Sequence, residues 1–477
     1  MKTFLFYDIE TTGLSSTFDQ ILTFAAIRTD YNFSEIHRKY ITINLRNDII
    51  PSSGAFITHR LSPQELSSGI CEYKAAQKIY EIMNEPETIN LGYNNLEFDD
   101  EFLRFTFYRN LLDSYTHQYA NKCSRMDLLP IATLYKIFKP EIIKWPEING
   151  KPTMKLEYIN KENSLVSSGR AHHAMTDVEA TLELAKKLSR EKKMWDYSLD
   201  FFNKKKDLQR IKKIEKNFKT DYLDYRICIM ISTAFGAENM YIAPVMNIGN
   251  SRKYSNQSLW LKLDSKNLIP LKSDYKKDEL FVIRKRYGET KIVLPPLERF
   301  WKLLSKEQIK IYQENIDGIT KRSDIFEEII HYHQAYEYPF VPDLDPDASL
   351  YQTGFFLNQE KKDIALFNDA EIENKIFLST TIKSSRLKSL FKRIIFRNFS
   401  DIIPNSLLEE EYNNHIKKII SSNPENSIKG YKNDLKFTSK DGLEELYKNK
   451  KEIELDAEQH KILNWIESHI KNLIGIC

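Results

Sequence analysis

The sequence predicts an α/β domain with a mixed sheet, followed by a small β domain and a helical domain. Strand-like and helix-like patterns alternate up to about residue 195, short β-type runs fill residues 222 to about 341, and helical patterns dominate from about 345 onward. The chain of 477 residues also exceeds the size at which a single hydrophobic core usually stops growing. We expect domains at 1–195, 196–345 and 346–477.

Strands and helices alternate in the first domain. Apolar runs predict three successive antiparallel strands at Thr3 to Asp8, Phe24 to Thr29 and His37 to Asn44, and a short fourth strand ending in Leu91-Gly92-Tyr93-Asn94. Helical periodicity predicts helices at Tyr73 to Met83, Asp99 to Leu112, Arg125 to Phe138 and Ala174 to Met194. Antiparallel strands followed by βα units give a mixed sheet.

The pattern changes after the first domain. A lysine-rich run at 203–219 is interpreted as a solvated helix at the boundary, with contact to a polyanion as the alternative. The β-type runs that follow, YRICIMIS, NMYIAPVM, SLWLKLD, ELFVIRKRY and KIVLPP, predict a small barrel or sandwich. Helices are then predicted at Ser384 to Ile395, Leu407 to Ile420 and Ala457 to Ile474.

Composition excludes several classes of protein. The formal net charge of +3 is too small to identify a polyanion partner by bulk charge. The four cysteines form no metal-ligand spacing, which favours a reducing, intracellular setting. The N-terminus lacks the pattern of a signal peptide, and no segment approaches 18 uninterrupted apolar residues, so we expect no membrane association and a cytoplasmic location.

Carboxylates stand where the first strand ends. Asp8 and Glu10 follow the apolar run FLFY and precede a Thr-Thr-Gly turn, and residues i and i+2 of a strand point to the same face. A DxE pair alone is weak, because such pairs arise often by chance and most exposed acids only solubilise a strand edge.

Two further clusters strengthen the pattern. Asp99 lies at a strand-to-helix junction, and His172 and Asp177 open a later helix about one turn apart. Taken singly, Asp99 could be an N-cap, His172 a surface histidine and Asp177 a first-turn acid that complements the helix dipole.

The clusters together indicate a metal site. Four gathered carboxylates would repel one another, and divalent cations with a preference for oxygen remove that conflict. Two Mg²⁺ or Mn²⁺ ions about 3.5–4 Å apart are the arrangement used for phosphodiester cleavage, and a nearby imidazole can accept the proton of the attacking water. His172 is the expected base, and His173 is its rival.

These motifs resemble a known superfamily. DIETTG at Asp8, the Asn94-x3-Phe98-Asp99 motif and His172-x4-Asp177 are similar to the three motifs of the DEDD 3′→5′ exonucleases, and the histidine, with no Tyr four residues before Asp177, indicates the DEDDh branch. A second set of stretches extends over nearly the whole chain: QILTFAAIRTD, GYNNLEFDDEFLRFTFYRN, SRMDLLPI, AHHAMTDVEATLELAKK, FGAENMYIAP and LYQTGFF. These stretches further resemble the bacterial exonuclease I family.

The resemblance implies a fold and site roles. It implies a ribonuclease H-like exonuclease domain, an SH3-like β domain and a helical domain that together clamp DNA. It also implies that Asp8, Glu10 and Asp177 are metal ligands, that Asp99 positions the second metal, and that His172 is the general base. Lys155 stands where an arginine is expected, so its contact with a phosphate would not be bidentate.

Single-stranded nucleic acid binding needs cations for phosphates and flat rings for bases. Candidates flank the acidic site: Glu10, Thr12, Leu14, Arg104, Arg109, Tyr115, Tyr119, Lys155, Arg170 and Lys204. Thr12 and Leu14 are expected to hold the 3′ nucleotide. The alternative for the aromatic residues is an ordinary place in the core.

The expected function is Mg²⁺-dependent, processive degradation of single-stranded DNA from its 3′ end to 5′-mononucleotides, in DNA repair and recombination. An RNA-trimming or proofreading exonuclease and a catalytically silent nucleic-acid-binding or scaffold protein are the alternatives. By the resemblance, the acidic C-terminal tail of single-stranded-DNA-binding protein is a partner, and a monomer is expected.

Overall fold

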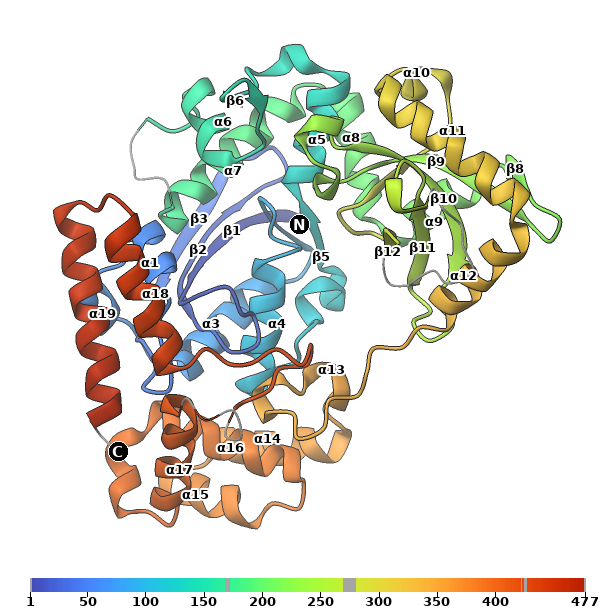
Figure 1. Ribbon diagram of the computed structural model, residues 1–477. Helices are drawn as coiled ribbons and strands as arrows, with labels where there is room; N and C mark the ends of the chain where they lie inside the picture. The colour runs from blue at the N-terminus through green and yellow to red at the C-terminus, as the bar shows by residue number, and fades with distance from the viewer. Residues whose placement is uncertain (1, 168–171, 269–279, 422, 424–426, 476–477) are drawn as a thin grey trace. The chain divides into compact units, whose positions relative to one another are not determined.

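The computed structural model describes residues 2–167, 172–268, 280–421, 423 and 427–475 (Figure 1). Two compact units are present. The first contains residues 1–125, 168–179 and 340–477, and the second contains residues 126–167 and 180–339. Each unit is assembled from separate chain segments, so the domain boundaries at 195/196 and 345/346 stay predictions.

A five-stranded sheet with the order β3-β2-β1-β4-β5 begins the first unit. β1 (Thr3–Thr11) pairs antiparallel with β2 (Ile21–Thr29) and parallel with β4 (Thr88–Gly92). β2 pairs antiparallel with β3 (Glu35–Thr42), and β5 spans Ser124–Asp127. The predicted mixed sheet is therefore confirmed.

Helices complete this part of the chain. They are α1 (Ser53–His59), α2 (Pro63–Ser67), α3 (Glu72–Met83), α4 (Asp99–Arg109) and α7 (Ala174–Ser189). The helix predicted from Arg125 was wrong at its start. Residues 124–127 form β5, and Asp127 then caps α5 (Leu128–Phe138) by accepting the Leu129 N–H. The helix predicted to reach Met194 is divided into α7 and α8 (Lys192–Leu199).

The C-terminal helices share a hydrophobic core with the start of the chain. They are α13 (Leu350–Thr353), α14 (Asn358–Asp369), α15 (Ile372–Thr381), α16 (Ser385–Asn398), α17 (Glu409–Ile420), α18 (Ser439–Glu452) and α19 (Ala457–Gly475). Phe18, Leu22 and Phe56 pack in one cluster with Ile462 and Ile466 of α19. The terminal helices thus bury apolar surface of the residues that follow β1.

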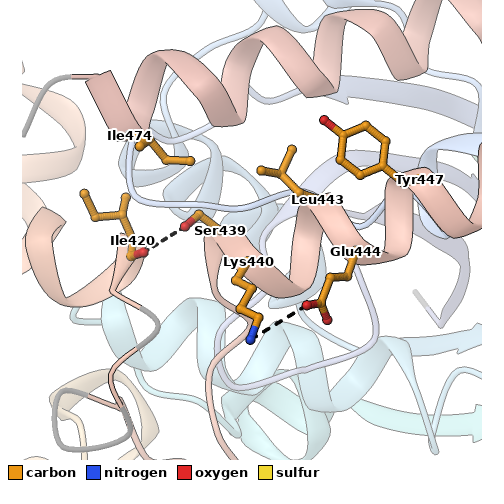
Figure 2. A pocket seen from close by; sticks show the side chains of 7 residues that line it. All are labelled: Ile420, Ser439, Lys440, Leu443, Glu444, Tyr447 and Ile474. Carbon is orange, nitrogen blue, oxygen red and sulfur yellow. Dashed lines mark hydrogen bonds and ion pairs between the residues drawn. The ribbon is translucent and has the colours of Figure 1, made fainter.

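A surface hollow lies where α17, α18 and α19 meet. It has a volume of about 340 Å³ and is lined by Ile420, Ser439, Lys440, Leu443, Glu444, Tyr447 and Ile474 (Figure 2). None of the predicted site residues lines it.

The second unit contains an antiparallel sheet with the order β12-β11-β10-β9-β13. Its strands are β8 (Phe218–Lys219), which pairs with β9, then β9 (Asp224–Ile231), β10 (Ile242–Asn250), β11 (Gln257–Lys262), β12 (Val282–Arg286) and β13 (Ile292–Leu294). This sheet confirms the predicted β domain.

Three helices in this stretch were not predicted. They are α10 (Glu298–Trp301), α11 (Lys306–Lys321) and α12 (Ser323–Ala335). A capping box of Ser305 and Gln308 starts α11, and Ile319 and Phe326 pack on the sheet beside Leu259.

The remaining elements of the second unit are α6 (Leu156–Asn163), α9 (Lys204–Lys212) and the short strands β6 (Glu147–Ile148) and β7 (Lys151–Pro152). The lysine-rich run is helical only in its first part, because residues 218–219 belong to β8. Across the described residues, no helix is both long enough and apolar enough to cross a membrane.

Candidate active site

The end of β1 carries two carboxylates on one face. Leu5, Tyr7 and Ile9 point into the hydrophobic core on one side of the strand, so Asp8 and Glu10 point to the other side. Both acids are half-buried within an otherwise buried strand. The local pattern follows from the strand period of two, which places alternate residues in different surroundings.

Asp177 joins these two acids from the first turn of α7. One carboxylate oxygen each from Asp8, Glu10 and Asp177 lie within 4.8 Å of one another. Three hard oxygen donors at this spacing fit a divalent cation such as Mg²⁺ or Mn²⁺. The structure therefore brings the predicted metal ligands from distant parts of the sequence to one point.

Asp99 lies against the same strand. It is buried at the start of α4, and its Oδ1 accepts a hydrogen bond from the Ile9 N–H at 3.2 Å. β4 pairs with β1 only as far as Phe6, so Asp99 occupies the strand edge beyond the end of β4. Asp99 is a helical residue after the cap position, which argues against the alternative that it is only an N-cap.

Neighbouring negative charges surround the carboxylates of Asp8 and Glu10. Burial, followed by the negative charges of Asp99 and Glu10, raises the pKa of Asp8 well above its ordinary value. Burial, followed by Asp177 and Asp99, raises the pKa of Glu10 to about 9. A bound divalent cation would replace this repulsion with attraction, which is the fit expected of a metal site.

His172 lies just before α7 and is exposed, with a positive φ of 59°. Its neighbour His173 is held differently. The His173 ring stacks on Tyr40 of β3 with the ring centres 5.3 Å apart, and its Nε2 lies 3.4 Å from the Tyr40 hydroxyl. His173 is thus engaged by Tyr40, and the choice of His172 over His173 as the base stays a prediction.

A third histidine lies near this site and was not identified from the sequence. His59 ends α1, and its Nδ1 accepts the Leu61 N–H at 3.0 Å. Burial lowers the pKa of His59 to about 3. A hydrogen bond with the Thr11 backbone raises this pKa by a smaller amount, and the nearby His172 lowers it further. Its imidazole is therefore neutral beside the turn at residues 11–14. A histidine at the end of a short amphipathic helix gives no signal of this placement.

We call residues 11–14 the catalytic turn. Thr12 is fully buried, and its hydroxyl donates to Asp19 at 2.9 Å and accepts the Gln20 N–H at 2.9 Å. A Cβ on Gly13 would come within 2.5 Å of Asp19, so only glycine fits there. Thr12 therefore holds the turn together through its side chain, and its contact with the 3′ nucleotide stays a prediction, as does that of Leu14, which is 85% exposed.

Two arginines predicted to contact DNA are buried instead. Arg104 forms ion pairs with Asp100 and Glu101, and Arg109 pairs with Glu72 at 2.9 Å. α4 is enclosed on nearly every face, so these guanidinium groups neutralise internal carboxylates. The structure thus places both side chains inside the protein, and their contact with DNA stays a prediction.

The other residues that were predicted to contact DNA and that the structure describes lie at or near the surface. Tyr115 is half-buried beneath Arg104 and touches Phe355 edge-on, and Tyr119 is 62% exposed. Lys155 and Lys204 are exposed in the second unit. Arg170 lies outside the described residues.

Comparison with protein families supports the assignment of the first domain. A family model described as Exonuclease matches residues 5–185, and one described as Exonuclease I C-terminal domain matches residues 344–473. The first match contains all of the acidic residues and His172.

Relatives match along most of the chain. Exodeoxyribonuclease I of Buchnera aphidicola from Acyrthosiphon pisum is 30% identical over 413 residues, which cover 83% of this chain and 97% of the relative. Exodeoxyribonuclease I of Escherichia coli is 30% identical over 422 residues, covering 83% of this chain and 86% of that protein.

Solved structures agree with this result. The E. coli ExoI–ssDNA complex in its metal-free form superposes with a TM-score of 0.82 at 25% identity, covering 99% of this chain and 100% of that one. The complex of E. coli exonuclease I with a dA16 oligonucleotide gives 0.83 over the same shares at 25% identity. These matches confirm the ribonuclease H-like, β and helical architecture, and the chain belongs to the exodeoxyribonuclease I family of hydrolytic exonucleases.

Proposed function

We propose that this protein degrades single-stranded DNA from the 3′ end and releases 5′-mononucleotides by Mg²⁺-dependent hydrolysis. The observation that carries the proposal is the group of carboxylates of Asp8, Glu10 and Asp177, which offer one oxygen each within 4.8 Å of one another. Family membership supports the substrate, because solved relatives are E. coli exonuclease I in complex with single-stranded DNA.

Asp8, Glu10 and Asp177 would hold the first cation, and Asp99 would position the second. Two divalent cations, when bound, would neutralise the charge that develops on the attacking and leaving oxygens. Mn²⁺ could substitute for Mg²⁺, because both prefer oxygen ligands. Asp99 is held to β1 through the Ile9 N–H, so its carboxylate keeps a fixed position relative to Asp8 and Glu10.

His172 would accept the proton of the attacking water. Its exposure and its position beside the first turn of α7 suit a group that exchanges protons with solvent. Glu10 has the added task of contacting the 3′ nucleotide, next to the exposed side chain of Leu14.

The strand path outside the site would use rings and cations. Tyr115 and Tyr119 would stack on bases, and Lys155, Lys204 and Arg170 would contact phosphates. We propose processive action, because a path of many weak contacts keeps the strand bound between cleavages.

The proposal extends to the cellular setting. The protein would act as a cytoplasmic monomer in DNA repair and recombination, and would bind the acidic C-terminal tail of single-stranded-DNA-binding protein. The affinity of the protein for the tail peptide, compared with its affinity for a peptide of scrambled sequence, tests this partner.

The direct test uses one oligonucleotide labelled at either end. With Mg²⁺, the 3′-labelled strand should release labelled mononucleotide at once, and the 5′-labelled strand should shorten progressively. EDTA and Asp8→Asn should each abolish both signals. RNA of the same sequence serves as the matched substrate. Faster cleavage of RNA than of DNA would overturn the proposed substrate. Absence of metal-dependent cleavage would overturn the proposed function.

A further inference from the structure

α18 makes a polar contact with the residues that support the catalytic turn. Glu445 of α18 accepts the Ser52 hydroxyl through Oε1 at 2.9 Å and the Ser53 N–H through Oε2 at 3.1 Å. Asn449, one turn later, donates its side-chain amide to the Ser53 hydroxyl at 2.8 Å. The start of α1 is therefore held by side chains that lie almost four hundred residues away in the sequence.

The same serine holds the catalytic turn. The Ser52 N–H donates to the Thr12 carbonyl oxygen at 2.8 Å, while the Thr12 N–H donates to the Gln20 carbonyl at 2.9 Å. Thr12 is only two residues after Glu10. One short chain of contacts thus runs from Glu445 through Ser52 to Thr12, and all of it lies within the first compact unit.

Apolar packing supports this chain of contacts. Gly442 of α18 lies so close to Ile50 that a Cβ on it would approach the Ile50 side chain to 2.6 Å. Ile50 and Phe56 share a buried cluster with Leu446 of α18. α18 therefore has little freedom to move relative to residues 50–56.

We propose that Glu445 is a positioning residue for hydrolysis, acting through Ser52 on the catalytic turn and so on the placement of Glu10 and Leu14. Glu445 touches no substrate. It fixes Ser52, whose N–H determines where the Thr12 carbonyl lies. The inference rests on the proposed function, because it assigns the turn to the 3′ end of the substrate.

Loss of the Glu445 carboxylate should displace the turn without unfolding the protein. Glu445 is half-buried, so water can replace it at the Ser52 hydroxyl and the Ser53 N–H. The Ser52–Thr12 hydrogen bond would then lose its fixed donor. Small displacements at a catalytic centre reduce turnover far more than they reduce binding along an extended path.

The experiment compares Glu445→Ala with Glu444→Ala in the full-length protein. Glu444 is the neighbouring acid on the same helix, but it lines the surface hollow and pairs with Lys440 (Figure 2). Each variant is assayed with single-stranded DNA and with the p-nitrophenyl ester of thymidine 5′-phosphate, which reports on the catalytic centre without the strand path. The Kd for single-stranded DNA is measured separately in the presence of EDTA, so that the strand is bound without being cleaved.

Glu445→Ala should lower kcat about tenfold on both substrates, while the Kd for the strand changes less than about twofold. Glu444→Ala should leave both kcat and the Kd for the strand unchanged. Glu445→Gln should recover part of the activity, because its amide oxygen can still accept one of the two hydrogen bonds. Ser52→Ala combined with Glu445→Ala should cost little more than either change alone.

Equal kcat for Glu445→Ala and wild type, with wild-type cleavage intact, would overturn the inference and leave the proposed function standing. Equal and additive losses at Ser52 and Glu445 would also overturn it. Wild-type protein without nuclease activity would instead refute the proposed function.

Discussion

Two groups of carboxylates in the first compact unit, one half-buried and one fully buried, have pKa values shifted in opposite directions. At the end of β1, burial and mutual repulsion raise the pKa of Asp8 and Glu10. Where the chain's C-terminal helices meet the first domain, burial alone would raise the pKa of Asp48, but Arg397 and Arg46 hold it well below its usual range. Arg109 and Arg46 likewise lower the pKa of Glu72, although burial alone would raise it.

The difference separates stability from function. We call Arg46, Asp48, Glu72, Arg109, Asp347 and Arg397 the arginine network; its ion pairs are almost completely buried. Each carboxylate there has a guanidinium partner within the chain. For Asp8 and Glu10, the neighbouring groups that shift the pKa are other carboxylates, which favours a cation from outside the chain.

Asp8→Asn should have the largest effect on activity. Removing one ligand charge should lower kcat by about a thousandfold, since the cations contribute several kcal/mol to the transition state. The same change relieves repulsion, so the melting temperature measured in EDTA should stay equal or rise. A matched measurement with Mg²⁺ should show that the variant loses the stabilisation by metal that wild type gains. Retained activity would contradict the ligand assignment.

Arg397→Met should have the largest effect on stability. Arg397 pairs with Asp48 at 2.8 Å and with Asp347, and all three side chains are nearly inaccessible. Removing one partner of a buried pair leaves uncompensated charge and should lower the free energy of unfolding by about 3–5 kcal/mol. Urea denaturation measures this loss. Lys392→Met, which removes a partner of the exposed Glu411, is the control and should change stability by less than about 1 kcal/mol.

His172→Ala should remove most turnover, about a hundredfold, while strand binding in EDTA is retained. His173→Ala should be mild, because its ring contacts Tyr40 and has no assigned proton to accept. Cleavage rates of the two variants at saturating substrate provide the comparison. The reverse order of effects would assign the base to His173.

The smallest effect concerns pH. The folded-state pKa of Glu10 is about 9 against an ordinary value of 4.5, so between these values the folded protein holds a proton that the unfolded chain has released. In EDTA this contribution to stability is present at low pH and is lost as pH rises through that range. Melting temperatures of wild type and Glu10→Gln should therefore be similar at low pH and separate as pH rises, with wild type falling below the variant, and Mg²⁺ should reduce the slope for wild type. An unchanged slope in Glu10→Gln would show that another group causes it.

Only part of the acidic site could be predicted from local geometry. Asp8 and Glu10 share a face through strand alternation alone, but Asp177 was expected to join them from the three motifs together and from the family resemblance. The role of Thr12 could not be predicted in the same way. A turn sequence does not reveal that Asp19 and Gln20 already use its hydroxyl.

The differences between the sequence-based expectations and the structure have physical causes that lie outside local sequence. Arg104 and Arg109 follow an amphipathic pattern that suggests an exposed face, but α4 is surrounded by other elements and meets internal acids. The helices α11 and α12 were obscured by the neighbouring β-type runs. The contact of Glu445 with Ser52 joins residues too far apart in sequence for any periodicity to indicate it.

The shared core of the first and last segments has a consequence for synthesis. Phe18, Leu22 and Phe56 leave the ribosome early, but the α19 side chains that bury them emerge much later. During translation, the strand that carries Asp8 and Glu10 is therefore followed by apolar surface that has no cover. The cluster around Phe18, Leu22 and Phe56 therefore closes only after the C-terminal helices have been made, and until then this surface is open to aggregation.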